Sequence, residues 1–444
     1  MQTSPKPKDA RKPLREGLQA AGQYGALQTA GRFYPVACVA LEITQKCNLD
    51  CTLCYLSEHA EQARDVPLVI LFQRIAMVHA QYGEGTNIQI TGGDPTLRAI
   101  EDIEAICKEI KRLNMRSCLM TNGIRATRPR LKRLAAAGLN DVAFHVDLTQ
   151  ERQGYDSEIA LNKIREKYIA RAQGLGLRIL FNTTVYEGNL AEIPALCAFF
   201  KGQSRHLALV SFQMQADTGR GTEDKRRTWL TQDVLSKQIG KGFGVAFPSK
   251  IGIGHSGCSR YDHLAIAGDT AVSILSDTQL VKRAISALEA ADTDEHAVAN
   301  SRKNWRKAPL HDPGLILHAG KTLLKVLWRL RSGLLSSRRV PSRMSVVLHS
   351  FMDAKALEPE RCASCVFMVA TSQGPVSMCV FNAERDAQLF APVALEHGTQ
   401  KLWWSAATGE LTENPVEARP EVPKFKNMKG RQRAKAAGQR EHST

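Results

Sequence analysis

The sequence has no long hydrophobic run. None of its apolar stretches reaches the roughly 18 residues that a helix needs to span a bilayer, which excludes a protein built from transmembrane helices. The first residues, MQTSPKPKDARKPLREG, are basic and polar and lack the apolar core of a secretory signal. We therefore expect a cytoplasmic protein whose eleven cysteines stay reduced. Cysteines in such a protein are more typical of metal sites, catalytic groups or small core positions than of a disulfide framework.

Acidic residues are scarce in two segments. The chain carries 60 Lys and Arg residues against 44 Asp and Glu residues, which gives a net charge of +16. Residues 301–343 hold 11 basic residues and one acidic residue, and residues 424–444 hold 7 and one. These two excesses account for the whole net charge, so the rest of the chain is near neutral. The basic segments suit either solubility and flexible tails, or contact with anionic lipid headgroups or nucleic acid.

Apolar, strand-like runs alternate with amphipathic stretches of helical length from residue 36 to about residue 215. Six strands with helices between them predict an α/β fold with a parallel sheet, because parallel neighbours need crossover connections. Periodicity alone leaves a partial barrel and an open doubly wound sheet as alternatives. The predicted strands are 36–44, 86–91, 116–121, 141–147, 178–185 and 207–213. The predicted helices lie near 67–82, 97–113, 127–137, 158–173 and 189–200.

The pattern divides the chain into four segments. We expect an N-terminal leader at 1–35, the α/β core at 36–215 and a C-terminal region at 216–417. That region contains a basic helical insert at 278–345. Residues 418–444 have lost apolar periodicity and are predicted to form a basic disordered tail.

Three cysteines follow the first predicted strand, at Cys47, Cys51 and Cys54. A disulfide uses two cysteines, and a structural zinc site usually uses four ligands. A [4Fe–4S] cluster has four iron corners, and a short loop can ligate three of them and leave the fourth open to a substrate or cofactor. The spacing therefore favours an open iron–sulfur cluster. Zinc is the alternative, with His59 as the nearby fourth ligand.

The second predicted strand ends in Gly92, Gly93, Asp94 and Pro95. Two glycines permit close approach of the backbone to a ligand, and the Asp–Pro pair fixes the turn. This turn and the cysteine loop both follow strands, so both lie at the carboxyl edge of the sheet. Ligands of parallel α/β folds bind at that edge.

Polar residues follow the other predicted strands and indicate the rim of a site. For His145 the alternative is a buried core histidine. The residues are Asn122, His145, Asp147, Asn182, Thr183, Thr184 and Gln213.

These motifs together resemble the radical S-adenosylmethionine (SAM) superfamily over about residues 36–215. The resemblance rests on the C-x3-C-x2-C loop, the GGDP turn and the Thr-Asn-Gly after the third strand. It implies a partial (β/α)6 TIM-like barrel, and a [4Fe–4S] cluster whose open iron chelates SAM. It also implies reductive cleavage of SAM to a 5′-deoxyadenosyl radical, which abstracts hydrogen from a substrate.

The resemblance also assigns residues to the binding of SAM. It implies that Gly92 and Gly93, with Asp94 and Pro95, contact the amino group of SAM. The other residues that it implies for SAM binding are Asn122, Asp147 and Asn182, the last two near the ribose.

A second group of cysteines lies in the C-terminal region, at Cys258, Cys362, Cys365 and Cys379. Four thiolates would close an auxiliary [4Fe–4S] cluster or an all-cysteine zinc site. The C-x2-C pair also fits a redox motif, and Cys258 and Cys379 also fit small buried residues. The cysteines expected in the core are Cys38, Cys107, Cys118 and Cys197.

The C-terminal pattern resembles a narrower group, the tetraether-synthase-like radical SAM proteins, which join or modify lipid alkyl chains. The resemblance rests on SFMDAKALEPERC and MCVFN, with SFQ and TGR after the sixth strand. Residues 1–37 lack the additional amino-terminal cysteine motifs of that group's founding members. The basic, Trp-containing segment 301–343 suits contact with a membrane surface, and a helical subdomain packed on the barrel is the alternative.

We therefore expect a radical SAM enzyme that acts on a hydrophobic, lipid-like substrate. Its expected partners are SAM and a reduced electron donor such as ferredoxin or flavodoxin. We also expect peripheral contact with the inner membrane face through 301–343. The alternatives are a radical SAM enzyme that modifies a peptide or protein, and a nucleic-acid-binding iron–sulfur or zinc protein. We do not expect nucleic acid as a partner, because no nucleic-acid motif is present and the charge lies outside the sheet.

Overall fold

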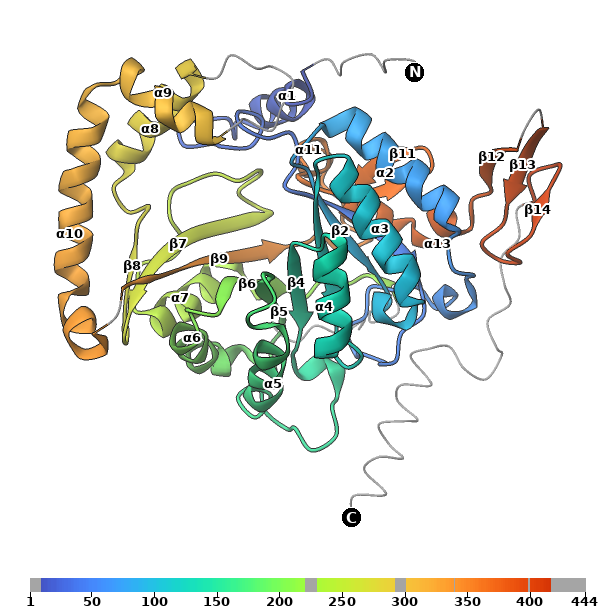
Figure 1. Cartoon of the computed structure of the whole chain (residues 1–444), viewed down its shortest axis with the longest axis horizontal. Helices are drawn as coiled ribbons and strands as arrows, with labels where there is room; N and C mark the ends of the chain where they lie inside the picture. The colour runs from blue at the N-terminus through green and yellow to red at the C-terminus, as the bar shows by residue number, and fades with distance from the viewer. Residues whose placement is uncertain (1–8, 220–229, 292–300, 339, 398–399, 417–444) are drawn as a thin grey trace.

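The structure is a computed structural model of the chain (Figure 1). It describes residues 9–219, 230–291, 301–338, 340–397 and 400–416. The predicted disordered tail at 418–444 lies outside the described residues, as do the first eight residues of the predicted leader.

Six parallel strands with helices between them form the centre of the fold, at the positions that the sequence predicts. Each strand pairs in parallel with the next, from β1 to β6. All seven residues of β1 are buried, as expected for a parallel strand that is covered on both faces. The strands are β1 (Cys38–Thr44), β2 (Asn87–Gly92), β3 (Arg116–Thr121), β4 (Asp141–His145), β5 (Arg178–Val185) and β6 (Leu207–Met214). The helices are α2 (Leu68–Tyr82), α3 (Ile100–Arg112), α4 (Arg128–Ala137), α5 (Asn162–Ala172) and α6 (Ile193–Gly202).

Strands from the C-terminal region extend the same sheet at both edges. β9 (Ser342–Ser350) pairs in parallel with β6, and β10 (Phe367–Thr371) pairs in parallel with β1. Three antiparallel strands complete the edges: β7 (Ser259–Ala267), β8 (Thr270–Ser273) and β11 (Gly374–Ser377). The strand order is β11-β10-β1-β2-β3-β4-β5-β6-β9-β7-β8. The predicted α/β class is confirmed, with one large and mostly parallel sheet. Among the described residues β11 and β8 do not pair, so the sheet is open.

Helices interrupt the alternation between β6 and β9. α7 (Gln232–Phe243) packs beside α6, and three further helices follow β8. These three are α8 (Thr278–Ala291), α9 (Ser301–His311) and α10 (Gly314–Ser337), and α10 forms one edge of the molecule beside β8 in Figure 1. α10 lies so close to the β7–β8 hairpin that a Cβ on Gly333 would come within 1.9 Å of the Ala267 oxygen. Within the described part of the chain, no helix has the length and apolarity that crossing a membrane requires.

Short elements cover the remaining edges. α1 (Lys12–Ala20) packs on α11 (Pro359–Ala363), and its Leu14 and Leu18 are buried against Val366. α12 (Met378–Ala383) and α13 (Arg385–Phe390) lead to a separate sheet of three antiparallel strands, which projects at the side of the molecule opposite α10 (Figure 1). Its strands are β12 (Val393–His397), β13 (Gln400–Trp404) and β14 (Leu411–Thr412).

Candidate functional site

The loop that leaves β1 carries Cys47, Cys51 and Cys54, all partly exposed and without a disulfide. The three residues line one cavity of about 1110 Å³, together with Gly92 and Gly93. We call it the central cavity. Three accessible thiols on one short loop, facing a single space beside the carboxyl ends of the strands, are a donor set that fits a cluster with an open corner.

Gly92 and Gly93 seat this loop on the end of β2. Gly92 has φ +123°, and a Cβ on it would lie 1.9 Å from the Thr44 oxygen. A Cβ on Gly93 would lie 2.1 Å from the Lys46 oxygen. Because real Cβ atoms do not approach so closely, only glycine lets the backbone that leads into Cys47 lie here. The sequence predicted close approach of a ligand, and the structure shows close approach of the cysteine loop itself.

Asp94 is a buried acceptor that joins the ends of β2 and β3. Its carboxylate accepts hydrogen bonds from the Thr121 hydroxyl at 2.9 Å and from the Asn122 backbone N–H at 2.9 Å. Its own N–H donates to the Lys46 oxygen at 2.8 Å. Asp94 and Pro95 do not line the central cavity. Asp94 instead holds Thr121 and Asn122, which do line it.

Asn122 reaches the cysteine loop directly. Its side-chain amide donates to the Asn48 Oδ1 at 2.7 Å and lies 4.0 Å from the Cys47 Sγ. It also lines the central cavity. An amide beside a thiolate places a hydrogen-bond donor near the sulfur, the kind of contact that tunes metal–sulfur sites.

The ends of β4 and β5 place a second set of polar groups on the rim. His145, Asn182 and Thr184 line the central cavity, whereas Asp147 is fully buried behind them. Asp147 accepts from the Thr184 N–H at 2.7 Å and lies 2.6 Å from the His145 Nε2. Burial would raise the pKa of Asp147, but the ion pair with His145 and these hydrogen bonds lower it to about 2. His145 is therefore a histidine on the cavity wall that is paired with Asp147. Burial lowers the pKa of His145, but Asp147 raises it by more, so the net shift is upward.

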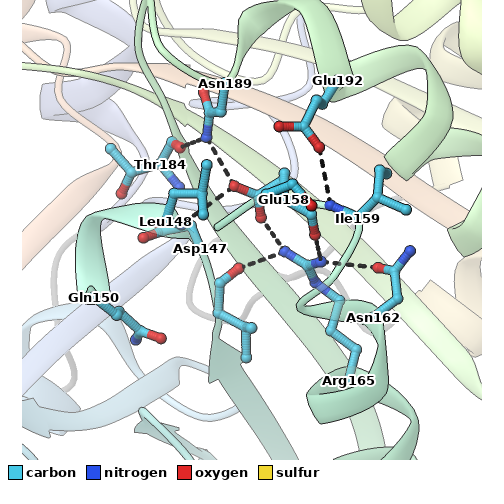
Figure 2. Close-up of polar contacts among 12 residues, drawn as sticks. Asp147, Leu148, Gln150, Glu158, Ile159, Asn162, Arg165, Thr184, Asn189 and Glu192 are labelled. Atoms are coloured by element: carbon cyan, nitrogen blue, oxygen red, sulfur yellow. Dashed lines mark hydrogen bonds and ion pairs between the residues drawn. The ribbon is translucent and has the colours of Figure 1, made fainter. Parts of the chain in front are cut away.

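A buried ion pair between Arg165 and Glu158 holds the loops that form this rim (Figure 2). Arg165 forms a hydrogen-bonded ion pair with Glu158 and donates to the Val146 oxygen at 2.8 Å. Glu158 also accepts from the Asn189 amide at 3.0 Å and from the Leu148 N–H at 3.3 Å. The network therefore ties the loop after β4 to the loop after β5.

The sequence did not indicate one contact of the site, between β1 and α13. Arg385 donates to both carboxylate oxygens of Glu42, at 2.9 and 3.0 Å, and lies over the Tyr55 ring. The Tyr55 hydroxyl in turn donates to the Gly92 oxygen. The two ionised partners are 343 positions apart, so no local pattern could have paired them.

A side-chain contact links two of the four cysteines of the C-terminal region, because Arg361, which directly precedes Cys362, donates to the Cys258 Sγ at 3.2 Å. Cys258 precedes β7, Cys362 lies on α11, Cys365 follows α11, and Cys379 is the second residue of α12. Burial raises the pKa of each thiol. The neighbouring thiols of the group contribute to that rise for all four. In the described ranges, no three His, Cys, Asp or Glu side chains are arranged to hold a single metal ion. Cys38, Cys107, Cys118 and Cys197 are buried, as the sequence predicted.

The central cavity extends far beyond the cysteine loop. Apolar side chains of α8 form part of its wall, and the exposed Trp305 of α9 also lines it. The apolar residues from α8 are Leu280, Val281, Ala284, Ile285 and Leu288.

Comparison with known proteins supports the resemblance. Residues 41–199 match the family model described as Radical SAM superfamily. The chain is 28% identical over 166 residues to a PqqA peptide cyclase of Methylobacterium nodulans, which covers 36% of this chain and 42% of that protein. It is 28% identical over 189 residues to a GTP 3′,8-cyclase of Aquifex aeolicus, which covers 40% of this chain and 57% of that protein. The chain thus spans about half the length of these curated relatives.

A solved structure described as native anSMEcpe with bound AdoMet and Cp18Cys peptide is also similar. It has 16% sequence identity and a TM-score of 0.37, and the match covers 46% of this chain and 59% of that one.

We predict that Arg165→Met destabilises the rim and the whole fold. The substitution leaves the carboxylate of Glu158 buried without its cation, which should lower the free energy of unfolding by about 3–5 kcal/mol. Chemical denaturation followed by circular dichroism measures the loss. Arg112→Met is the matched control, because Arg112 forms an exposed ion pair with Glu109 and should change stability little. Equal losses in the two variants would contradict the role of the buried pair.

Proposed function

We propose that this chain is an enzyme that cleaves SAM at a [4Fe–4S] cluster. The premise is that residues 41–199 form a radical SAM superfamily domain. Cys47, Cys51 and Cys54 would hold the cluster. When bound, it supplies the single electron for reductive cleavage of SAM and generation of the 5′-deoxyadenosyl radical that abstracts hydrogen from a substrate. The observation that carries the proposal is the shared cavity of the three thiols and the Gly92–Gly93 turn.

This chain's residues orient SAM and keep it against the cysteine loop. Gly92 and Gly93 line the cavity together with the three cysteines, which supports their proposed contact with the amino group of SAM. Asn122 and Asn182 present side-chain amides to the same space, and Asp94 and Asp147 fix their neighbours from behind. A buried and preorganised rim of this kind orients the reacting carbon and excludes water.

The apolar extension of the cavity supports a hydrophobic substrate, such as a lipid. Leu280, Ala284 and Leu288 of α8 offer hydrocarbon contact and no hydrogen-bond donor on their side chains. Modification of a peptide or protein is the second candidate, favoured by the similarity to PqqA peptide cyclases. The similarity of the C-terminal pattern to tetraether-synthase-like proteins stays a prediction.

Cys258, Cys362, Cys365 and Cys379 are proposed to hold a second [4Fe–4S] cluster. Arg361, which directly precedes Cys362, donates to the Cys258 Sγ at 3.2 Å, and this contact supports a common site. A reduced donor such as ferredoxin or flavodoxin would supply the electrons.

α10 is proposed to rest on an anionic membrane surface. One of its faces carries exposed apolar side chains that recur with helical spacing. Lys321, Lys325 and Arg329, spaced four residues apart, flank that face and suit anionic headgroups. The exposed apolar residues of α10 are Ile316, Leu317, Leu323, Leu324, Leu327, Trp328 and Leu335.

We expect about eight irons per chain after anaerobic reconstitution, and release of 5′-deoxyadenosine from SAM under reduction. Cys51→Ala should bind about four fewer irons and release no deoxyadenosine, and Cys362→Ala should also bind about four fewer. Cys197→Ala, a change of a buried thiol on α6, is the control and should keep both. A cluster-loaded wild-type protein without deoxyadenosine release would overturn the proposed function. An unchanged iron content in Cys362→Ala would contradict the proposed second cluster.

We expect the full chain to float with vesicles that contain phosphatidylglycerol, and to float less with pure phosphatidylcholine. Leu324→Gln combined with Trp328→Gln should weaken binding by about tenfold or more, because two apolar side chains then leave the bilayer interface. Leu411→Gln changes a side chain of similar exposure on β14, at the far side of the molecule, and should bind like wild type. Equal flotation of all three proteins would refute the membrane contact.

A further inference from the structure

The central cavity has a charged end opposite the cysteine loop. Arg178 begins β5 and His263 lies on β7, and both line the cavity. Arg343 lies near the start of β9, on the same face of the strand as Val347 and His349, which also line the cavity. Arg178 and Arg343 come from the amino ends of β5 and β9, and His263 comes from the middle of β7, whereas the cysteine loop follows the carboxyl end of β1.

The charges at this end do not balance. Asp141, which also lines the cavity, lies 3.0 Å from an Arg116 nitrogen and 3.7 Å from an Arg178 nitrogen, so two cations share one carboxylate. The Arg343 backbone pairs with Ala265 of β7, and its side chain forms no hydrogen bond or ion pair with another described residue. His263 pairs with Ser345 of β9, two residues from Arg343, so the side chains of His263 and Arg343 lie on the same face of neighbouring strands. Burial, and then Arg343 and Arg178, lower the pKa of His263. The Arg178 side chain is 51% exposed and can be reached by an anion.

Apolar residues separate the two ends. Leu180 on β5, Leu209 on β6 and Val347 on β9 line the cavity between the arginines and the polar rim. Arg178 and Thr184 lie six residues apart on one strand, which corresponds to about 20 Å. The cavity therefore has arginine at one end, thiols at the other end, and a wall between them on which Leu180, Leu209 and Val347 form an apolar strip.

We propose that Arg178 and Arg343, with His263, form a binding subsite for the carboxylate or phosphate group of an amphiphilic molecule. The apolar chain of that molecule would extend through the cavity toward the cysteine loop. Guanidinium groups suit this role because they bind carboxylate and phosphate oxygens in pairs. The identification of this molecule as the substrate rests on the proposed function, but its binding does not require cleavage of SAM.

Calorimetric titration of the cluster-loaded full chain, without SAM, tests the subsite. The probes are decanoate, decyl phosphate, the neutral decanol and inorganic phosphate. We expect decanoate and decyl phosphate to bind about tenfold or more tightly than decanol, because each gains charge-assisted hydrogen bonds. We expect inorganic phosphate to bind more weakly than decyl phosphate, because it lacks the chain. Equal affinities for decyl phosphate and inorganic phosphate would contradict the proposal that the ligand is amphiphilic.

The variant Arg178→Gln/Arg343→Gln should lower the affinity for decanoate and decyl phosphate to that for decanol, and leave decanol binding unchanged. Arg112→Gln, at an exposed position on α3, is the control and should bind all four probes like wild type. Retention of the anion preference in the double variant would overturn the subsite. Release of deoxyadenosine, measured on the same wild-type sample, is a separate result. If the protein releases no deoxyadenosine but still prefers the anionic probes, the proposed function is contradicted and the anion-binding subsite is not.

Discussion

The contact between the backbone of Thr44–Lys46 and the glycine pair at the end of β2 is the constraint on which the cysteine loop depends. Hydrogen bonds from Gly93 to Thr44 and from Asp94 to Lys46 fix the loop just before its first cysteine. Any side chain at Gly92 or Gly93 would occupy the space of that backbone. The position of three thiols at the cavity is therefore set by two residues that carry no side chain.

Buried acids extend this constraint around the rim. Asp94 joins β2 to β3, Asp147 joins β4 to β5, and Glu158 with Arg165 supports the loops that follow β4 and β5. Each carboxylate accepts several hydrogen bonds, as a buried charge must if it is not to destabilise the fold. The groups that face the cavity are therefore held in place by buried carboxylates that do not face it.

The sequence predicted much of the fold because its signals were local. Hydrophobic alternation located all six central strands to within about two residues at each end. The GGDP turn and the cysteine spacing predicted a site at the carboxyl edge, and the structure brings the three cysteines and Gly92–Gly93 to one cavity. By contrast, nothing local indicated that β9 and β10 pair with β6 and β1, since sheet pairing depends on contacts between residues distant in the chain. The sequence did not predict the Glu42–Arg385 pair or the cationic end of the cavity, because both join residues that are distant in the chain.

Substitution of Gly93 by alanine tests the central claim most directly, with iron content and SAM binding as the readouts. Gly93→Ala should lose about four irons per chain and bind SAM at least tenfold more weakly, while the irons of the second cysteine group and the circular dichroism spectrum are kept. Gly202→Ala places a methyl group in open space at the end of α6 and should match wild type. Full iron content and wild-type SAM binding in Gly93→Ala would contradict the account.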